Sequence, residues 1–199
     1  MASRRARWLT LAPETWRRDL LRIVLRITAV FGSIVYVPSV FLAVKYRMAG
    51  VVVVDTAAIA AILALTFFER APPRLRAAGC CLVFYVLGAG LLIGVGSISQ
   101  IYLFGFSLMT TLLLSFRWGL ATVALNAATM LATGYLGVAA PEMVVPGWPW
   151  SFGAWSLVTS NFVMINVSLV LALGAVISAL ESALGRAIAA REALAQEQE

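Results

Sequence analysis

Residues 77–97 read AAGCCLVFYVLGAGLLIGVGS and contain no charged side chain. About 20 predominantly apolar residues in a helix are needed to cross the hydrocarbon core of a bilayer, and this stretch meets that length. It also contains the spacing Gly90-x-x-x-Gly94, which allows two helices to approach closely in lipid. The stretch therefore predicts a membrane-spanning helix that packs tightly against a neighbouring helix.

Five further apolar runs surround this one, and the fourth run of the chain is the shortest. The whole chain of 199 residues is 62% hydrophobic and 12% charged, with a mean hydropathy of +0.94, whereas soluble domains are about 45–50% apolar and about 25% charged. We therefore expect an all-α integral membrane protein, a bundle of six transmembrane helices. The other five runs are Val24–Val44, Gly50–Phe68, Ile101–Phe116, Gly119–Ala139 and Trp155–Leu180.

The basic residues predict how the bundle is oriented. If the N-terminus is cytoplasmic, all of the 15 Lys and Arg residues except Lys45 and Arg47 fall on the cytoplasmic side, as the positive-inside rule requires. Both termini are then cytoplasmic. The formal net charge of +6 follows from this bias and does not require a nucleic-acid partner.

Three regions are expected along the chain. Residues 1–23 form a cytoplasmic amphipathic segment, in which arginines alternate with Trp16, Leu20 and Leu21. Residues 24–180 form the six-helix bundle. Residues 181–199 form a cytoplasmic helix that continues directly out of the last span.

The C-terminal stretch ISALESALGRAIAAREALAQEQE has the spacing of a coiled-coil seam. Apolar residues recur at intervals of three and four, with Arg191 at one seam position. We expect this helix to pair in parallel within a homodimer and to transmit a signal. The residues assigned to transmission are Leu180, Leu184, Ala187 and Leu194, which continue a seam that starts at Ile177.

Known catalytic arrangements find little support in the sequence. The chain has no histidine, which excludes Ser–His and Cys–His nucleophiles, His-ligated zinc or haem, and a phospho-accepting histidine within these residues. Cys80 and Cys81 are adjacent and are interpreted as small packing residues. A lipid-modifying enzyme would need a cluster of carboxylates, whereas Asp55, Glu69 and Glu142 are isolated. We expect no enzymatic activity, no cofactor and no metal.

Asp55 is the carboxylate that lies well inside an apolar run. A charge there costs a few kcal/mol unless it is paired, protonated or hydrated, so it is expected to face the bundle interior. The alternating directions of the spans bring other polar and aromatic residues to similar depth in the outer half of the bundle. The alternative interpretation is a set of interhelical hydrogen bonds, each worth about 0.6 kcal/mol. The predicted ligand-binding residues are Asp55, Tyr36, Thr133, Thr129, Asn161, Tyr102 and Trp155.

The order of these features resembles a known class of protein. WRRDLLR precedes a first span with VYVPSV, the Gly-rich third span leads through a short polar turn to an aromatic fourth span, and Arg117 and Gly119 open the fifth. This order is similar to that of the N-terminal multi-pass membrane sensor region of bacterial sensor histidine kinases. The resemblance implies a two-component sensor in the bacterial inner membrane, with the last helix leading to dimerisation and kinase domains. The kinase part is absent from this chain.

Two functions therefore remain open. The first is a receptor module that binds a small apolar or amphipathic ligand and signals to a histidine kinase. The second is the substrate-capture subunit of a membrane importer of vitamins or metals, for which the small-residue stretch AAIAAILA, Ala57 to Ala64, offers a docking face. A lipid-like signal, a quinone or an aromatic small molecule fits the predicted pocket equally well, and so does the sensing of a membrane property.

The predicted orientation can be tested at the loop PEMVVPGWPWSFGAW, whose Trp148, Trp150 and Trp155 suit an interfacial aromatic belt. We expect a membrane-impermeant thiol reagent to label a single cysteine introduced beside Trp148 in intact cells. In inside-out vesicles this loop is enclosed, so the reagent should not label the cysteine. Labelling from the cytoplasmic side alone would contradict the orientation.

Overall fold

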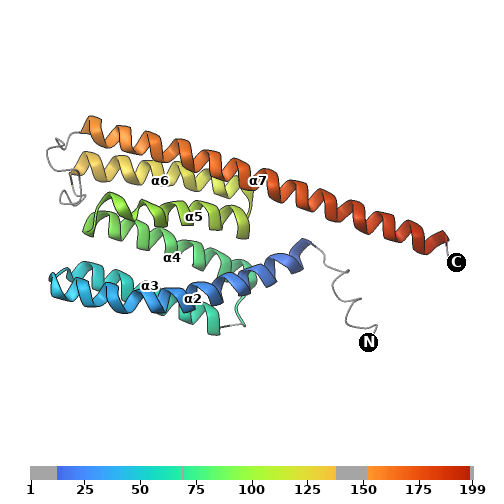
Figure 1. The fold of residues 1–199 in the computed structure, drawn as a ribbon, viewed down its shortest axis with the longest axis horizontal. Helices are drawn as coiled ribbons and strands as arrows, with labels where there is room; N and C mark the ends of the chain where they lie inside the picture. Colours follow the sequence, from blue (N-terminus) through green and yellow to red (C-terminus); the bar gives the residue numbers. More distant parts are fainter. Residues whose placement is uncertain (1–12, 69, 138–151, 198–199) are drawn as a thin grey trace.

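The computed structural model describes residues 13–68, 70–137 and 152–197, and in these ranges the chain is helical with no strand (Figure 1). The prediction of an all-α protein is therefore confirmed. Residues 1–12 of the expected amphipathic segment, and the loop with Trp148 and Trp150, lie outside the described residues. The helices are α2 (Pro13–Lys45), α3 (Ala49–Phe67), α4 (Pro73–Gly94), a short 3-10 turn η1 (Ser97–Ser99), α5 (Gln100–Leu113), α6 (Phe116–Leu136) and α7 (Phe152–Glu197).

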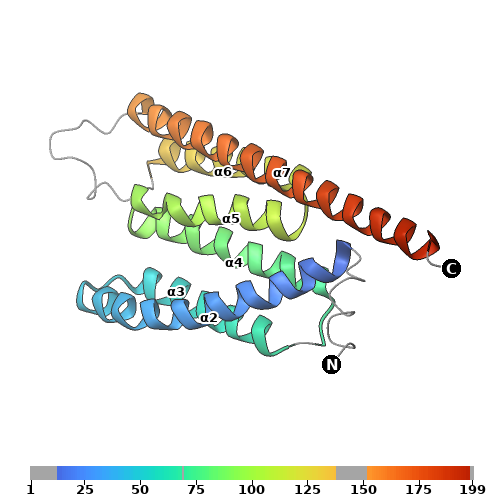
Figure 2. The ribbon, with the colours of Figure 1, turned by 45° about the vertical axis from the view of Figure 1, so that its right-hand side comes forward.

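The six long helices lie side by side, and helices that follow one another in the chain are neighbours in space (Figures 1 and 2). The pair α2 and α3 flanks α4 and α5, and the pair α6 and α7 lies on the other side. The beginning of α2 and the end of α7 lie at the same end of the bundle. We call this the basic end, since Arg70 lies there in the turn before α4, and Arg74 and Arg117 lie in the first turns of α4 and α6, while Lys45 and Arg47 lie at the far end.

Within the described residues, five helices are long and apolar enough to cross a membrane: α2, α3, α4, α6 and α7. The fourth predicted span, Ile101–Phe116, is the shorter helix α5, and its 14 residues extend about 21 Å at 1.5 Å per residue, against about 30 Å of hydrocarbon. Helix α5 ends at Leu113 because the chain turns there to start α6. The Ser115 hydroxyl accepts a hydrogen bond from the Trp118 amide at 3.5 Å and caps the N-terminus of α6.

Helix α5 lies inside the bundle, which explains how a short helix is accommodated. Every residue from Tyr102 to Leu113 is buried or half-buried, because α4, α6 and α7 all contact this helix. Non-spanning backbone at membrane depth is tolerated where protein rather than lipid surrounds it.

Helix α2 is one continuous helix of 33 residues, so the expected surface segment and the first span are not separated by a break. It extends about 50 Å, more than a bilayer requires. Leu21, Leu25 and Ala29 form its buried stripe, while Arg18 and Arg22, one turn apart, are exposed. The amphipathic pattern therefore fixes which face of α2 packs against the bundle.

The glycines of α4 act as packing residues, as their spacing predicts. A Cβ at Gly90 would lie 3.0 Å from the Val54 side chain of α3, and one at Gly94 would lie 2.8 Å from Val51. Cys80 and Cys81 are free and buried in the hydrophobic core, which confirms their interpretation as packing residues.

Helix α7 continues without interruption for 46 residues, from the far end to beyond the basic end (Figure 1). The predicted continuity of the last span with the C-terminal helix is therefore confirmed. Leu180 and Leu194 are about 60% exposed, so these seam residues are available to a partner.

Candidate functional site

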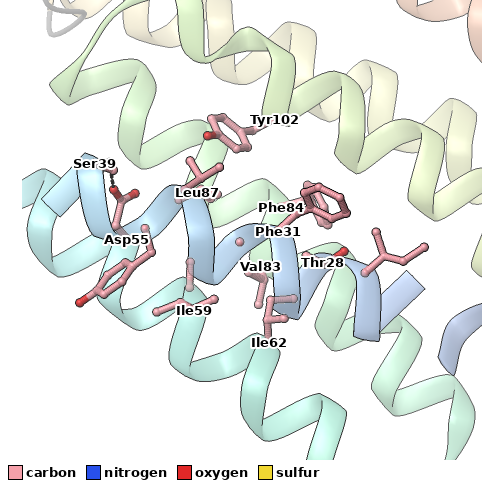
Figure 3. Close-up of a pocket in the computed structure, with 15 residues that line it drawn as sticks. Thr28, Phe31, Ser39, Asp55, Ile59, Ile62, Val83, Phe84, Leu87 and Tyr102 are labelled. Carbon is pink, nitrogen blue, oxygen red and sulfur yellow. Dashed lines mark hydrogen bonds between the residues drawn. The ribbon is translucent and has the colours of Figure 1, made fainter. Parts of the chain in front are cut away.

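A pocket opens between α2, α3 and α4, with one side chain contributed by α5 (Figure 3). Its volume is about 350 Å³, within the range typical of small-molecule sites. Most of its wall is apolar, with the rings of Phe31 and Phe84 and the side chains of Ile59 and Ile62 among the lining residues. The surface of the pocket is therefore mostly apolar.

Ser39 and Asp55 lie together at the end of the pocket nearer the far end of the bundle, whereas Thr28 lies toward the other end (Figure 3). The Ser39 hydroxyl of α2 donates a hydrogen bond of 2.5 Å to Asp55 Oδ2 of α3. Asp55 lies about 9 Å along α3 from Ala49 and is half-buried. The hydrogen bond lowers the cost of holding a carboxylate at this depth, and Asp55 is part of the pocket lining.

A second hydrogen bond between α2 and α3 flanks the first. Tyr36 Oη and Thr56 Oγ1 are 3.0 Å apart, and the Thr56 hydroxyl donates to the Val52 carbonyl at 2.6 Å. Because a threonine hydroxyl has one proton, Tyr36 is the donor to Thr56. The two hydrogen bonds fix the register of α2 against α3 along the pocket.

The described residues contain no group of three His, Cys, Asp or Glu side chains that would hold a metal ion. The carboxylate of Asp55 has serine and tyrosine neighbours instead. This arrangement offers groups for hydrogen bonding and for charge pairing.

Sequence comparison decides the family. The MASE11 family model matches residues 15–180, from the first turn of α2 to the part of α7 that leaves the bundle. The chain belongs to the MASE11 family. This family comprises membrane-associated sensor domains, which agrees at that level with the resemblance to a membrane sensor region. No curated protein and no solved structure matches the chain.

In this MASE11 domain, three of the seven predicted ligand-binding residues converge on the pocket: Asp55, Tyr36 and Tyr102. Thr129 Oγ1 lies 2.9 Å from Tyr85 Oη, and Thr129 is not among the residues that line the pocket. Asn161 is exposed on α7. The prediction assumed one cavity common to all spans, whereas α4 and α5 separate α6 and α7 from the pocket.

The other two predicted residues, Thr133 of α6 and Trp155 of α7, are both buried and both donate to one backbone carbonyl of α6. The Thr133 hydroxyl donates to the Met130 carbonyl at 2.9 Å, and Trp155 Nε1 donates to the same carbonyl. Trp155 is 2% exposed, and its ring fills the space above Gly134. Trp155 therefore holds α6 and α7 together, whereas the hydrogen bond of Thr133 stays within α6, and neither residue lines the pocket of the MASE11 domain.

Sequence reasoning missed Ser39, the residue that holds Asp55. A helical signal was present, because pocket-lining Thr28, Gly32, Tyr36 and Ser39 recur at intervals of three or four on one face of α2. Combined with the single carboxylate of α3, that face predicts a polar contact between these two helices.

A separate polar cluster lies deep between α5, α6 and α7. Asn126 Nδ2 donates to the Leu103 carbonyl at 2.8 Å and to Ser107 Oγ at 2.9 Å. Asn166 Nδ2 approaches the same Ser107 oxygen at 3.3 Å. All three side chains are fully buried, so this cluster joins three helices and does not open to a ligand.

The contact between Gly134 and Trp155 generates a stability prediction. Replacing Gly134 with Ala should lower the free energy of unfolding by about 1–3 kcal/mol, because the added methyl group overlaps with the indole ring. Gly185→Ala is the matched control, since nothing lies within 4 Å of a Cβ there, and it should be neutral or stabilising by up to about 1 kcal/mol. Thermal unfolding in detergent micelles measures both, and equal effects would contradict the packing role.

Proposed function

We propose that this chain is the receptor module of a bacterial membrane sensor, which binds a small amphipathic molecule in the pocket between α2, α3 and α4. Occupancy of the pocket is passed through α7 to a cytoplasmic output domain, a histidine kinase. Membership of a family of membrane-associated sensor domains supports the general role. The pocket and its connection to α7 support the finer assignment.

The lining of the pocket specifies the chemistry of the ligand. The apolar wall with Phe31 and Phe84 accommodates a hydrocarbon or aromatic body, and Asp55 at one end accepts a hydrogen bond or pairs with a cation. A carboxylate at membrane depth gains most from a cationic partner, because pairing offsets the cost of burying its charge. The best fit is therefore a small amphipathic amine.

One observation connects the pocket to α7 and carries the proposal. Helix α2 supplies lining residues from Ile27 to Ser39 and runs unbroken to Arg17, whose guanidinium contacts Glu181 of α7 at 3.2 Å. Arg17 also donates to the Leu114 carbonyl at 2.6 Å. A shift of α2 on ligand binding would therefore change a contact on the signalling helix.

The ion pair between Arg17 and Glu181 is suited to a reversible link. Both side chains are partly exposed, 29% and 42%, and ion pairs of this kind contribute about 0–1 kcal/mol. A ligand can shift a two-state equilibrium only by its differential affinity for the two states. A weak link therefore lets a ligand of modest affinity change the position of α7.

The ligand assignment predicts a selective effect of Asp55 variants. Asp55→Asn should retain the fold and abolish the stabilisation by small amphipathic amines. Asp55→Leu should also lower the free energy of unfolding by about 1–3 kcal/mol, because the Ser39 hydroxyl is left without its acceptor. A thermal-shift panel of amines and of alcohols with the same carbon skeleton measures both effects.

Asp19→Asn is the matched control for these variants, since Asp19 is an exposed carboxylate on α2 outside the pocket. It should leave the response to amines unchanged. An equal loss in Asp19→Asn and Asp55→Asn, or no response to any amphiphile in the panel, would contradict the proposed site.

The signalling role predicts periodic contacts along the C-terminal part of α7. Single cysteines in a Cys80→Ala, Cys81→Ala background should cross-link between two copies at Leu180, Leu184, Ala187 and Leu194, and not at the off-seam positions Ser182 and Ala189. The amount of disulfide-linked dimer at each position is measured on gels. The positions that cross-link most strongly should shift along the helix when a ligand is bound. Uniform or absent cross-linking would contradict a transmitting coil and favour the importer subunit.

A further inference from the structure

A second cavity, of about 660 Å³, lies at the basic end of the bundle, away from the ligand pocket. It is enclosed by the start of α2, the start of α4, the turn between α5 and α6, and α7. Its lining residues are Arg17, Arg18, Leu21, Pro72, Pro73, Arg74, Ala77, Leu113, Leu114, Ser115, Trp118 and Glu181.

The charge of this cavity is positive. Among the described residues that line it, Arg17, Arg18 and Arg74 carry positive charge and Glu181 is the single carboxylate. The N-termini of two helices add to this charge, because α4 begins at Pro73 and α6 at Phe116, beside lining residues of the cavity. The first turn of a helix carries a partial positive charge. No side chain caps the start of α4, where Pro73 has no N–H to donate, and Ser115 caps the start of α6. The arginines and these helix ends together favour an anion with several oxygen atoms, such as a phosphate group.

The rest of the lining is apolar and lies at the edge of the membrane-spanning region. Leu21, Leu113 and Leu114 form part of the wall, and Trp118 is 63% exposed beside them. Tryptophan is enriched at the level of lipid headgroups. A molecule with a phosphate group and an attached hydrocarbon chain matches both parts of the lining.

We propose that this cavity binds the phosphate headgroup of an anionic phospholipid, with Arg17, Arg18 and Arg74 around the phosphate. Basic pockets between transmembrane helices are typical sites for such headgroups. A soluble phosphate shares the chemistry of the headgroup, but it would leave the apolar wall unused. The site is distinct from the amine pocket and does not depend on the function assigned to that pocket.

Binding at this site is coupled to the contact between α2 and α7. Arg17 holds the Leu114 carbonyl and Glu181 at the same time. A phosphate in the cavity would attract the guanidinium of Arg17 and repel the carboxylate of Glu181. Lipid binding and the ion pair therefore compete, and removing the charge of Glu181 should favour the lipid.

The experiment uses the full chain in detergent micelles, titrated with phosphatidylglycerol and followed by native mass spectrometry. The double variant R18Q/R74Q should weaken phosphatidylglycerol binding about thirtyfold, at about fivefold for each arginine. R18K/R74K, which retains both charges, should lose much less. The thermal unfolding midpoint without lipid should match that of the wild type in both variants, which separates binding from folding.

The matched control is R26Q/R186Q, which removes two exposed arginines outside the cavity. It should bind phosphatidylglycerol within about twofold of the wild type, because exposed charges contribute weakly. Equal losses in the two glutamine double variants, or no loss in R18Q/R74Q, would overturn the site.

Two further measurements complete the test. Glu181→Gln should bind phosphatidylglycerol several-fold more tightly, whereas Asp19→Asn, which neutralises an exposed carboxylate outside the cavity, should not. Equal tightening in the two variants would overturn the competition. Inorganic phosphate at millimolar concentration should not displace the lipid, and displacement would overturn the lipid as the source of the phosphate group.

Discussion

Ser107, at the middle of α5, is the contact on which half of the bundle depends. Its hydroxyl oxygen accepts hydrogen bonds from the side-chain amides of Asn126 of α6 and Asn166 of α7, so three helices meet at one buried hydroxyl. In lipid there is no hydrophobic drive between helices, and association relies on close packing and interhelical hydrogen bonds. This contact explains why α5 stays enclosed although it is too short to cross a bilayer by itself.

The bundle consequently has two parts with different physical character. The part made of α5, α6 and α7 is joined by buried amides and by Trp155 packed over Gly134, which leaves little free space. The part made of α2 and α3 is joined by hydroxyl contacts at its far end and lines most of the apolar pocket with α4. The apolar pocket therefore lies outside the part of the bundle that the buried amides join.

Hydropathy and residue spacing predicted much of this arrangement. Apolar runs near span length predicted the helices, and Gly90 and Gly94 predicted a tight contact, which is with α3. The apolar spacing of three and four after Ile177 predicted the continuity of α7. The sequence showed that the fourth run is the shortest but not that α5 is enclosed by other helices, because enclosed and lipid-facing apolar residues look the same in a sequence.

The candidate site was predicted only in part, since sequence gives the depth of a residue in the membrane but not its neighbours. Asp55, Tyr36 and Tyr102 share a pocket because their helices are adjacent, whereas Thr129 and Thr133 have similar depth on a helix beyond α4 and α5. The length of α7 has a mechanical consequence. Its 46 residues measure about 69 Å, of which about 30 Å suffices for the bilayer, so the remainder is a lever arm. A pivot of about 5° at the membrane surface moves its tip by about 3 Å, which is enough to bring apolar side chains on two such helices into or out of contact.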